Sequence, residues 1–527
     1  MRRENVGVGS LDAAARTAAF LFFLLVCTVG HCQDADTLRM LTPYQRQSII
    51  DYCEQYGDIL SAGELANIDG FTPDEARWFW ESLKEASAPS GSGGRHLLST
   101  KFRKKYFSDG FSTTGKYRYE GRRLSAGLTV DNDPMEKFPN FLSGYLKYGN
   151  FIAGDFSARF GQGLVLWKAF SLNTMGEPST VMHRQAGFDG YKSSDESNYL
   201  RGICAKIPFG RQFECSAFAS YNKVDLKAVD STGVHEFVAG LNLSRSSENW
   251  RVGLTAVTYC YDKQVKRRVG DYNRLRLYDG LWGNAGIDFT CTLGHWRLFG
   301  EAAMDARASA AALIGAIWSP SYNLEASISA KAFSPSYSAT HSIGDTYNLI
   351  GGQASVKYLR GRWKFNLNAE YGWHPWYQYG KPAGETAIKA RFSAQYMFRK
   401  GAAATIQTSY NTALKMRVHL SVPVGHFTVS SRFEGNLKGY VIYAETSWHT
   451  DKFEVSARGT FYNTDSWDSR VYVYEKNTPE SFAVETFYGK GMGAYLIVRY
   501  TPIKHLDIWL KTRHDYSAFF IRMVIPG

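Results

Sequence analysis

The sequence has few continuous apolar stretches: the mean hydropathy of its 527 residues is −0.31, and its one long apolar run spans only residues 18–29. A helical transporter needs several apolar runs of about 20 residues, so that class is excluded. Arg2, Arg3 and Arg16 precede the short run, which is typical of a secretory signal peptide. We therefore expect residues 1–32 to form a signal peptide and the remainder to be exported.

Cysteines and catalytic motifs are also scarce. Two of the seven cysteines lie in the signal region, and the other five form no CxxC pair, which excludes a disulfide framework and a zinc site. No HExxH, GxSxG or P-loop sequence occurs, and the twelve histidines are scattered singly. We therefore expect no catalytic residue, no cofactor and no metal, and a protein that is not an enzyme.

Glycine and aromatic residues are abundant instead, and their arrangement indicates long strands. Over residues 363–371, apolar side chains alternate with Lys364, Asn366, Asn368 and Glu370. The same alternation recurs over residues 324–332, 388–398, 414–422 and 453–461. Such segments of about 10 residues match tilted strands that cross a membrane, whereas strands of soluble proteins usually span about 5–6 residues.

The lengths of the connections support the same interpretation. Short turns such as Arg360-Gly361 separate longer stretches at 161–198, 222–233, 262–281, 333–350, 373–386 and 463–490. Outer-membrane barrels combine short periplasmic turns with longer outer loops. The sequence therefore predicts a mainly β protein, a transmembrane antiparallel β-barrel of about 22 strands. Its strands are counted from about residue 118, its domain covers residues 96–527, and its final strand is Ala518–Ile525.

Residues 37–85 follow a different, helical pattern. Thr42-Pro43 and Thr72-Pro73 each place a capping threonine before a proline, and apolar residues follow at helical spacing. Residues 86–95 are rich in glycine and serine, which is typical of a flexible linker. We expect a small N-terminal all-α domain joined by this linker to the barrel.

The helical segment contains a candidate hairpin at Gly70, Phe71 and Thr72 that resembles a helix-hairpin-helix motif. In that motif, backbone N–H groups approach a nucleic-acid phosphate. Residues 37–84, however, hold four basic and eight acidic residues, a net charge of −4. Phosphate contacts dominate nucleic-acid affinity, so this charge disfavours DNA binding and favours a role in docking a protein or plugging the lumen.

The charge of the barrel region has the opposite sign. The first 84 residues carry a net charge of −5. Because the whole chain carries +12, residues 85–527 carry a net charge of +17. Many of these charges fall on the polar faces of the predicted strands. Two interpretations follow: a balanced, hydrated lumen, or a lumen that favours anionic solutes.

The stretch 161–198 is long and begins with Gly161-Gln162-Gly163, followed by apolar residues. Long loops of this kind are often functional, so we expect this one to fold inward and constrict the outer half of the barrel. The candidate residues of the constriction loop are Gln162, Trp167, Phe170, Asp195, Glu196 and Arg201, with Trp167 and Phe170 packed inward.

Several segments together resemble a known family. They are Leu128 to Pro134, Ser143-Gly144-Tyr145-Leu146, Gly154-Asp155-Phe156, Gly161 to Trp167, Ser193 to Glu196, and Arg201-Gly202. These segments resemble Bacteroidetes outer-membrane β-barrel proteins that carry an N-terminal helix-hairpin-helix (ComEA-like) domain, and Gly57 to Phe71 is similar to that domain. The resemblance implies an outer-membrane β-barrel. The ComEA-like label implies DNA binding and uptake, although Thr72, Asp74 and Glu75 depart from that pattern here.

Three functions follow as hypotheses. The first is a non-enzymatic outer-membrane barrel, a channel or a transport or assembly component in contact with outer-membrane lipid, whose residues 37–84 dock a periplasmic protein partner. The second is a DNA-binding or DNA-uptake protein. The third is an outer-membrane hydrolase, because a catalytic triad assembles in space and needs no local motif.

The acidic charge of residues 37–84 generates a test of the second hypothesis. We expect the full chain in detergent micelles and a variant lacking residues 37–84 to retain equal amounts of duplex DNA in filter binding, with the same salt dependence. Retention that drops when the segment is deleted would support DNA binding by the hairpin.

Overall fold

The computed structural model describes residues 94–526 except 108, 137, 170–175, 225–232, 265–267, 279, 345, 399–400 and 482–483. The predicted signal peptide (1–32), the helical domain (37–85) with its hairpin, and all but the end of the linker (86–95) lie outside the described residues. No helix among the described residues is long and apolar enough to cross a membrane.

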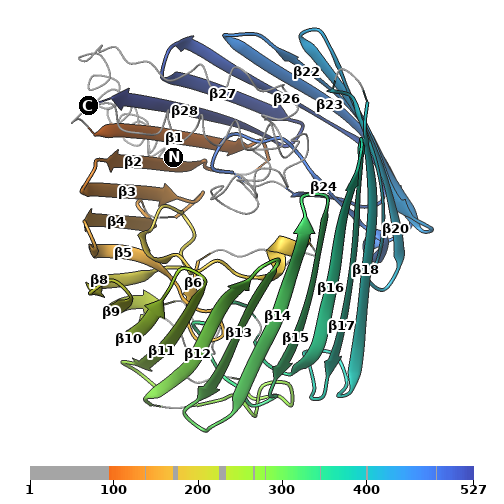
Figure 1. Cartoon of the computed structure of the whole chain (residues 1–527). Coiled ribbons are helices and arrows are strands. Elements are labelled where there is room, and N and C mark those ends of the chain that lie inside the picture. Colours follow the sequence, from red (N-terminus) through yellow and green to blue (C-terminus); the bar gives the residue numbers. More distant parts are fainter. Residues whose placement is uncertain are drawn as a thin grey trace, which may run out of the picture.

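The described chain forms a closed antiparallel barrel of 24 strands (Figure 1). The wall strands are β1 (Arg95–Lys105), β2 (Ser112–Glu120), β3 (Leu124–Asn132), β4 (Phe141–Tyr148), β5 (Phe151–Arg159), β8 (Leu200–Phe209), β9 (Phe213–Val224), β10 (Val234–Ser246), β11 (Trp250–Tyr261), β12 (Trp282–Leu293), β13 (Trp296–Asp305), β14 (Ala310–Ser321), β15 (Leu324–Phe333), β16 (Leu349–Arg360), β17 (Trp363–His374), β18 (Glu385–Met397), β19 (Ala403–Tyr410), β20 (Leu414–Val424), β21 (Phe427–Asn436), β22 (Gly439–His449), β23 (Phe453–Thr464), β26 (Lys490–Ile503), β27 (Leu506–Arg513) and β28 (Tyr516–Pro526). Each wall strand pairs with the next, and β1 pairs with β28 from Arg95↔Pro526 to Lys105↔Tyr516. The prediction of a mainly β, antiparallel barrel is therefore confirmed.

The barrel has two more strands than the central count of about 22, because its wall begins before residue 118. Strand β1 starts at Arg95, and β2 starts at Ser112. The outward face of β1 carries His96, Thr100 and Lys104 between its apolar residues. These polar side chains hide the alternation by which the other strands were recognised.

The connections at the two rims differ in length, as the sequence predicted. One rim carries short turns such as 149–150, 294–295 and 361–362, together with the start of β1 and the end of β28. The other rim carries the long connections, including 160–199, 262–281, 334–348 and 465–489. Because β28 ends where β1 begins, the described chain both enters and leaves the barrel at the short-turn rim.

Side chains alternate between an apolar outer face and a polar inner face. In β17, Leu367 points outward and is 52% exposed, whereas its neighbour Asn368 points inward and is 2% exposed. Exposed aliphatic and aromatic side chains recur around the outside, and buried polar or charged side chains such as Glu445, Arg458 and Lys511 lie inside. This arrangement is that of a barrel whose outer face contacts lipid and whose lumen is polar.

The two faces of β17 generate a test. We expect Leu367→Arg to lower the free energy of unfolding by about 2–4 kcal/mol, because it places a charge on the outer face near the bilayer midplane. Asn368→Arg is the matched control, since this residue faces the polar interior. Urea titration in lipid vesicles measures both, and equal losses would contradict the assigned faces.

Candidate functional site

Three connections from the long-loop rim fold back into the barrel. We name them loop A (residues 160–199), loop B (334–348) and loop C (465–489). Loop A contains β6 (Trp167–Lys168), the 3-10 turn η1 (Pro178–Val181) and β7 (Gly187–Gly190); loop C contains the 3-10 turn η3 (Trp467–Ser469), β24 (Val471–Tyr474) and β25 (Val484–Phe487). In Figure 1 the yellow chain between β5 and β8 runs inside the ring of strands. The candidate site is therefore the lumen together with the loops that fill it.

Loop A begins with a tight turn around a buried carboxylate. Glu301 projects inward from β13 and is 4% exposed. The backbone N–H groups of Gln162, Leu164 (3.1 Å) and Val165 (3.2 Å) donate hydrogen bonds to its carboxylate. Gly161 has φ +61°, and a Cβ there would lie 2.5 Å from the carboxylate. The turn is a nest of backbone donors around an anion, which explains the glycines of this motif.

Gln162 and Trp167 fix the rest of this turn inside the barrel. Gln162 accepts the backbone N–H of His183 (2.9 Å), and the ring of His183 lies 2.8 Å from the carbonyl of Gln162. Burial lowers the pKa of His183, so the imidazole is neutral and donates to that carbonyl. Trp167 is buried, and its backbone N–H donates to the carbonyl of His341 in loop B (2.6 Å). Phe170, the other residue expected to pack inward, lies outside the described residues.

Loops A and B pack together as one unit against β12. The hydroxyl of Tyr337 donates to the carbonyl of Leu164 at 2.8 Å. Trp282 and Asn284 donate from β12 to the carbonyl of Ser338 at 3.0 Å and 2.9 Å. Apolar side chains of both loops and of the neighbouring wall strands form one buried cluster. Loop B was recognised in the sequence only as a long stretch, and nothing in its composition indicated that it folds inward.

The far part of loop A reaches a distant wall. Glu177, directly before η1, lies 2.6 Å from the ammonium of Lys364 in β17 and 3.2 Å from that of Lys357 in β16. Burial alone would raise the pKa of Glu177, but the two lysines outweigh it, so the pKa lies below its usual value. Strand β16 is nine wall strands from β5, so the loop crosses most of the barrel.

Loop C also brings carboxylates to cations of the inner wall, on strands β27 and β2. Glu475 lies 3.5 Å from Lys511 and 3.3 Å from Arg513 on β27. Glu480 lies 2.9 Å from Lys116 and 3.4 Å from Arg118 on β2. The infolded loops therefore bring carboxylates to cations on the inner wall. Sequence reasoning missed these carboxylates, as it missed Glu301, because each pair joins residues from distant parts of the chain.

The wall next to loop A contains a seam where backbone pairing is interrupted. Pairing between β4 and β5 ends at Tyr145↔Gly154, and β5 then turns to pair with β7. Beyond that point the carboxylate of Asp155 accepts the N–H of Gly144 (3.0 Å). The guanidinium of Arg201 donates to the carbonyl of Leu142 (2.7 Å) and to both carboxylate oxygens of Asp155 (2.7 and 2.9 Å). The two side chains thus replace backbone hydrogen bonds that a neighbouring strand would make.

The remaining sequence candidates lie elsewhere. Asp195 closes a turn at the rim, where its carboxylate accepts the N–H of Ser197 (2.9 Å) and the side-chain amide of Asn198 (2.7 Å). Glu196 is exposed at the same rim. The structure therefore places Gln162 and Trp167 together inside the barrel, Asp195 and Glu196 at the rim, and Arg201 in the wall.

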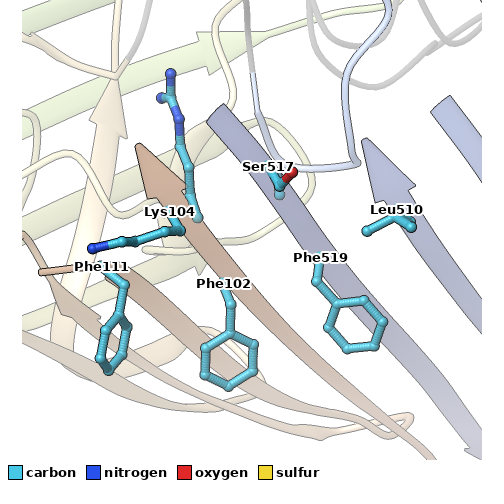
Figure 2. Close-up of a pocket in the computed structure, with 8 residues that line it drawn as sticks. Phe102, Lys104, Phe111, Leu510, Ser517 and Phe519 are labelled. Carbon is cyan, nitrogen blue, oxygen red and sulfur yellow. The ribbon is translucent and has the colours of Figure 1, made fainter. Parts of the chain in front are cut away.

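The outer wall also holds a cavity of about 440 Å³, lined mainly by Phe102 of β1, Phe111 directly before β2, Leu510 of β27 and Phe519 of β28. Figure 2 shows these aromatic rings on the outward side of the strands, with Lys104 beside Phe111. Because its lining is apolar and it opens outward, this cavity belongs to the lipid-facing surface and not to the lumen.

The seam generates a test of the ion pair in the wall. We expect Arg201→Ala to lower the free energy of unfolding by about 3 kcal/mol, because it leaves Asp155, whose side chain is 2% exposed, without its counter-charge. Arg211→Ala, at an exposed turn, is the matched control. The double variant Asp155→Asn with Arg201→Ala should lose less than the single variant. An equal loss in the single and double variants would show that the ion pair is not the relevant contact.

Comparisons with known proteins identify similar barrels but no family. No protein-family model and no curated protein sequence matches the chain. The ferric enterobactin receptor of Pseudomonas aeruginosa is 8% identical, with a TM-score of 0.40 over 83% of this chain and 81% of that one. The P pilus usher translocation pore is 9% identical, with a TM-score of 0.36 over 82% of this chain and 99% of that one. The FrpB iron transporter of Neisseria meningitidis is 10% identical, with a TM-score of 0.37 over 82% of this chain and 83% of that one. Similarity at this level identifies neither substrate nor partner.

Proposed function

We propose that the chain is a non-enzymatic barrel of the bacterial outer membrane that carries solutes through a lumen constricted by infolded loops. The observation that carries this proposal is the closed 24-stranded wall, apolar outside and polar inside, with loops A, B and C folded into it. A wall of this kind leaves no unpaired strand edge, which is what a bilayer requires of a spanning sheet.

The outer membrane is the location that fits the two rims. Outer-membrane barrels keep short turns on the periplasmic side and longer loops outside. By this rule the short-turn rim is periplasmic, and Arg95 begins β1 at that rim. The residues before it then start on the periplasmic side, where the predicted helical domain 37–85 would meet a protein partner.

Constriction by loops is the role that fits the size of the barrel. Barrels of 22 strands enclose a lumen that is usually plugged, and the wall described here has 24 strands. Loop A is held at its start by contacts to Glu301 and at its far part by the two lysines that bind Glu177. A nine-residue coil spans about 15–18 Å on average, so the linker predicted over residues 86–94 favours a helical domain that stays near the periplasmic rim. The infolded loops are therefore better placed than that domain to limit solute flow.

Planar-bilayer conductance tests this function. We expect deletion of residues 164–190 to raise the single-channel conductance several-fold, because it removes most of loop A from the lumen. Deletion of residues 37–84 should change the conductance little. If the second deletion opens the pore and the first does not, the helical domain is the plug; if no form of the protein conducts, the proposal fails.

A point substitution keeps loop A intact and guards against misfolding of the deletion variant. Glu177→Gln weakens the contacts to Lys357 and Lys364, so we expect more frequent openings without a change in the folded barrel on an unheated gel. Glu196→Gln removes an exposed rim carboxylate from the same loop and is the matched control.

A further inference from the structure

The inner wall of strands β18 to β21 carries cations to which the described loop residues bring no carboxylate. Lys389 points inward from β18, Lys415 and Arg417 point inward from β20, and Arg432 points inward from β21. Lys389 is 39% exposed and Arg417 is 32% exposed, although both face the barrel interior. Water therefore reaches this wall, which we name the basic wall.

Elsewhere the infolded loops neutralise the inner cations. Glu177 binds lysines of β16 and β17, Glu475 binds Lys511 of β27, and Glu480 binds Lys116 of β2. Each of these pairs joins a loop carboxylate to a wall cation on a strand outside β18–β21. Where a loop carboxylate lies near these cations of the inner wall, the two groups therefore form an ion pair.

The basic wall has only two carboxylate partners among the described residues, and both are wall residues. Glu370 lies 3.2 Å from Lys389, and Glu434 lies 2.7 Å from Arg417. Within the part of the chain that the structure describes, no carboxylate lies within 4.0 Å of Lys415 or Arg432. The wall therefore carries a net positive charge.

The positions of these groups form a track along the strands. On β20, the inward side chains of Lys415, Arg417 and His419 follow one another at every second residue. Arg432 is the direct neighbour of His419 across to β21. Its guanidinium lies 5.5 Å from the ring centre of Tyr443, and its buried Nε has no hydrogen-bond partner among the described residues. Donors and positive charge are thus both present along about four residues of strand.

We infer that the basic wall is the anion-binding face of the solute path and selects solutes that carry carboxylate or phosphate groups. Guanidinium and ammonium groups bind these oxyanions through charge-assisted hydrogen bonds. A wall lined by one sign of charge also raises the local concentration of the opposite ion. This inference rests on the proposed function, because selectivity requires a conducting barrel.

Reversal potentials in a KCl gradient across a planar bilayer test the inference. We expect the full chain to prefer Cl⁻ over K⁺, and the double variant Lys415→Gln with Arg432→Gln to lower that permeability ratio at least about twofold. Inorganic phosphate added to one side should reduce the KCl current of the full chain and reduce it less in the double variant. Arg432→Lys keeps the charge and should keep the preference for Cl⁻.

The control removes two positive charges outside the lumen. Lys438→Gln with Lys452→Gln alters exposed lysines in connections at opposite rims, so the permeability ratio should stay unchanged. Currents without a preference for Cl⁻, or equal effects of the two double variants, would overturn the inference while leaving the channel function intact. If the preference for Cl⁻ appears only after residues 37–84 are deleted, the basic wall binds that acidic segment and not a solute. That result would also overturn the inference. Absence of any current would reject the channel function itself.

Discussion

Backbone N–H and C=O groups inside a bilayer must be paired within the protein, because hydrocarbon offers them no partner. The strands meet this constraint by closing on themselves, with eleven residue pairs between β1 and β28 completing the ring. The alternation of side chains follows from closure, since each strand then has one face toward lipid and one toward the lumen. The loops could fold inward only because the same closure provides a polar interior to receive them.

Contacts of buried carboxylates fix the infolded loops to the inner wall at several points. Glu301 is bound by backbone donors of loop A, and Glu177 and Glu480 bind lysines of the wall. A buried ion pair gains little net stability, because desolvation offsets most of the Coulomb attraction, but it fixes which groups meet. The loop carboxylates therefore determine where each loop lies more than how firmly the barrel is folded. The basic wall differs because no described loop residue brings a carboxylate to it, and Lys389 and Arg417 remain partly exposed to water.

The sequence predicted the wall better than the contents of the lumen. Alternation in segments such as 363–371 is a local pattern, so strand β17 and its two faces were recognised from neighbouring residues alone. Strand β1 was missed because Thr100 and Lys104 interrupt its apolar face. The site depended on pairs far apart in the chain. Glu301 and Gln162 are 139 residues apart, and neither residue alone indicates the other. The long connections could be recognised in the sequence. Their inward direction could not be predicted, because it depends on contact partners that only the closed barrel brings near.

The seam beside loop A has a consequence for how this sequence can vary. Along most of the wall, neighbouring strands are joined by main-chain atoms, which every amino acid except proline supplies. Between β4 and β8, the side chains of Asp155 and Arg201 make some of these contacts instead. Only these side chains or close equivalents can make them. Neither can change alone without leaving a charge and a main-chain group unpaired. Gly154 and Gly202 face each other beside them, and a methyl group at either would lie about 2 Å from a carbonyl oxygen of the adjacent strand. Related barrels should therefore inherit these four positions as a set, or rebuild this part of the wall with an ordinary strand.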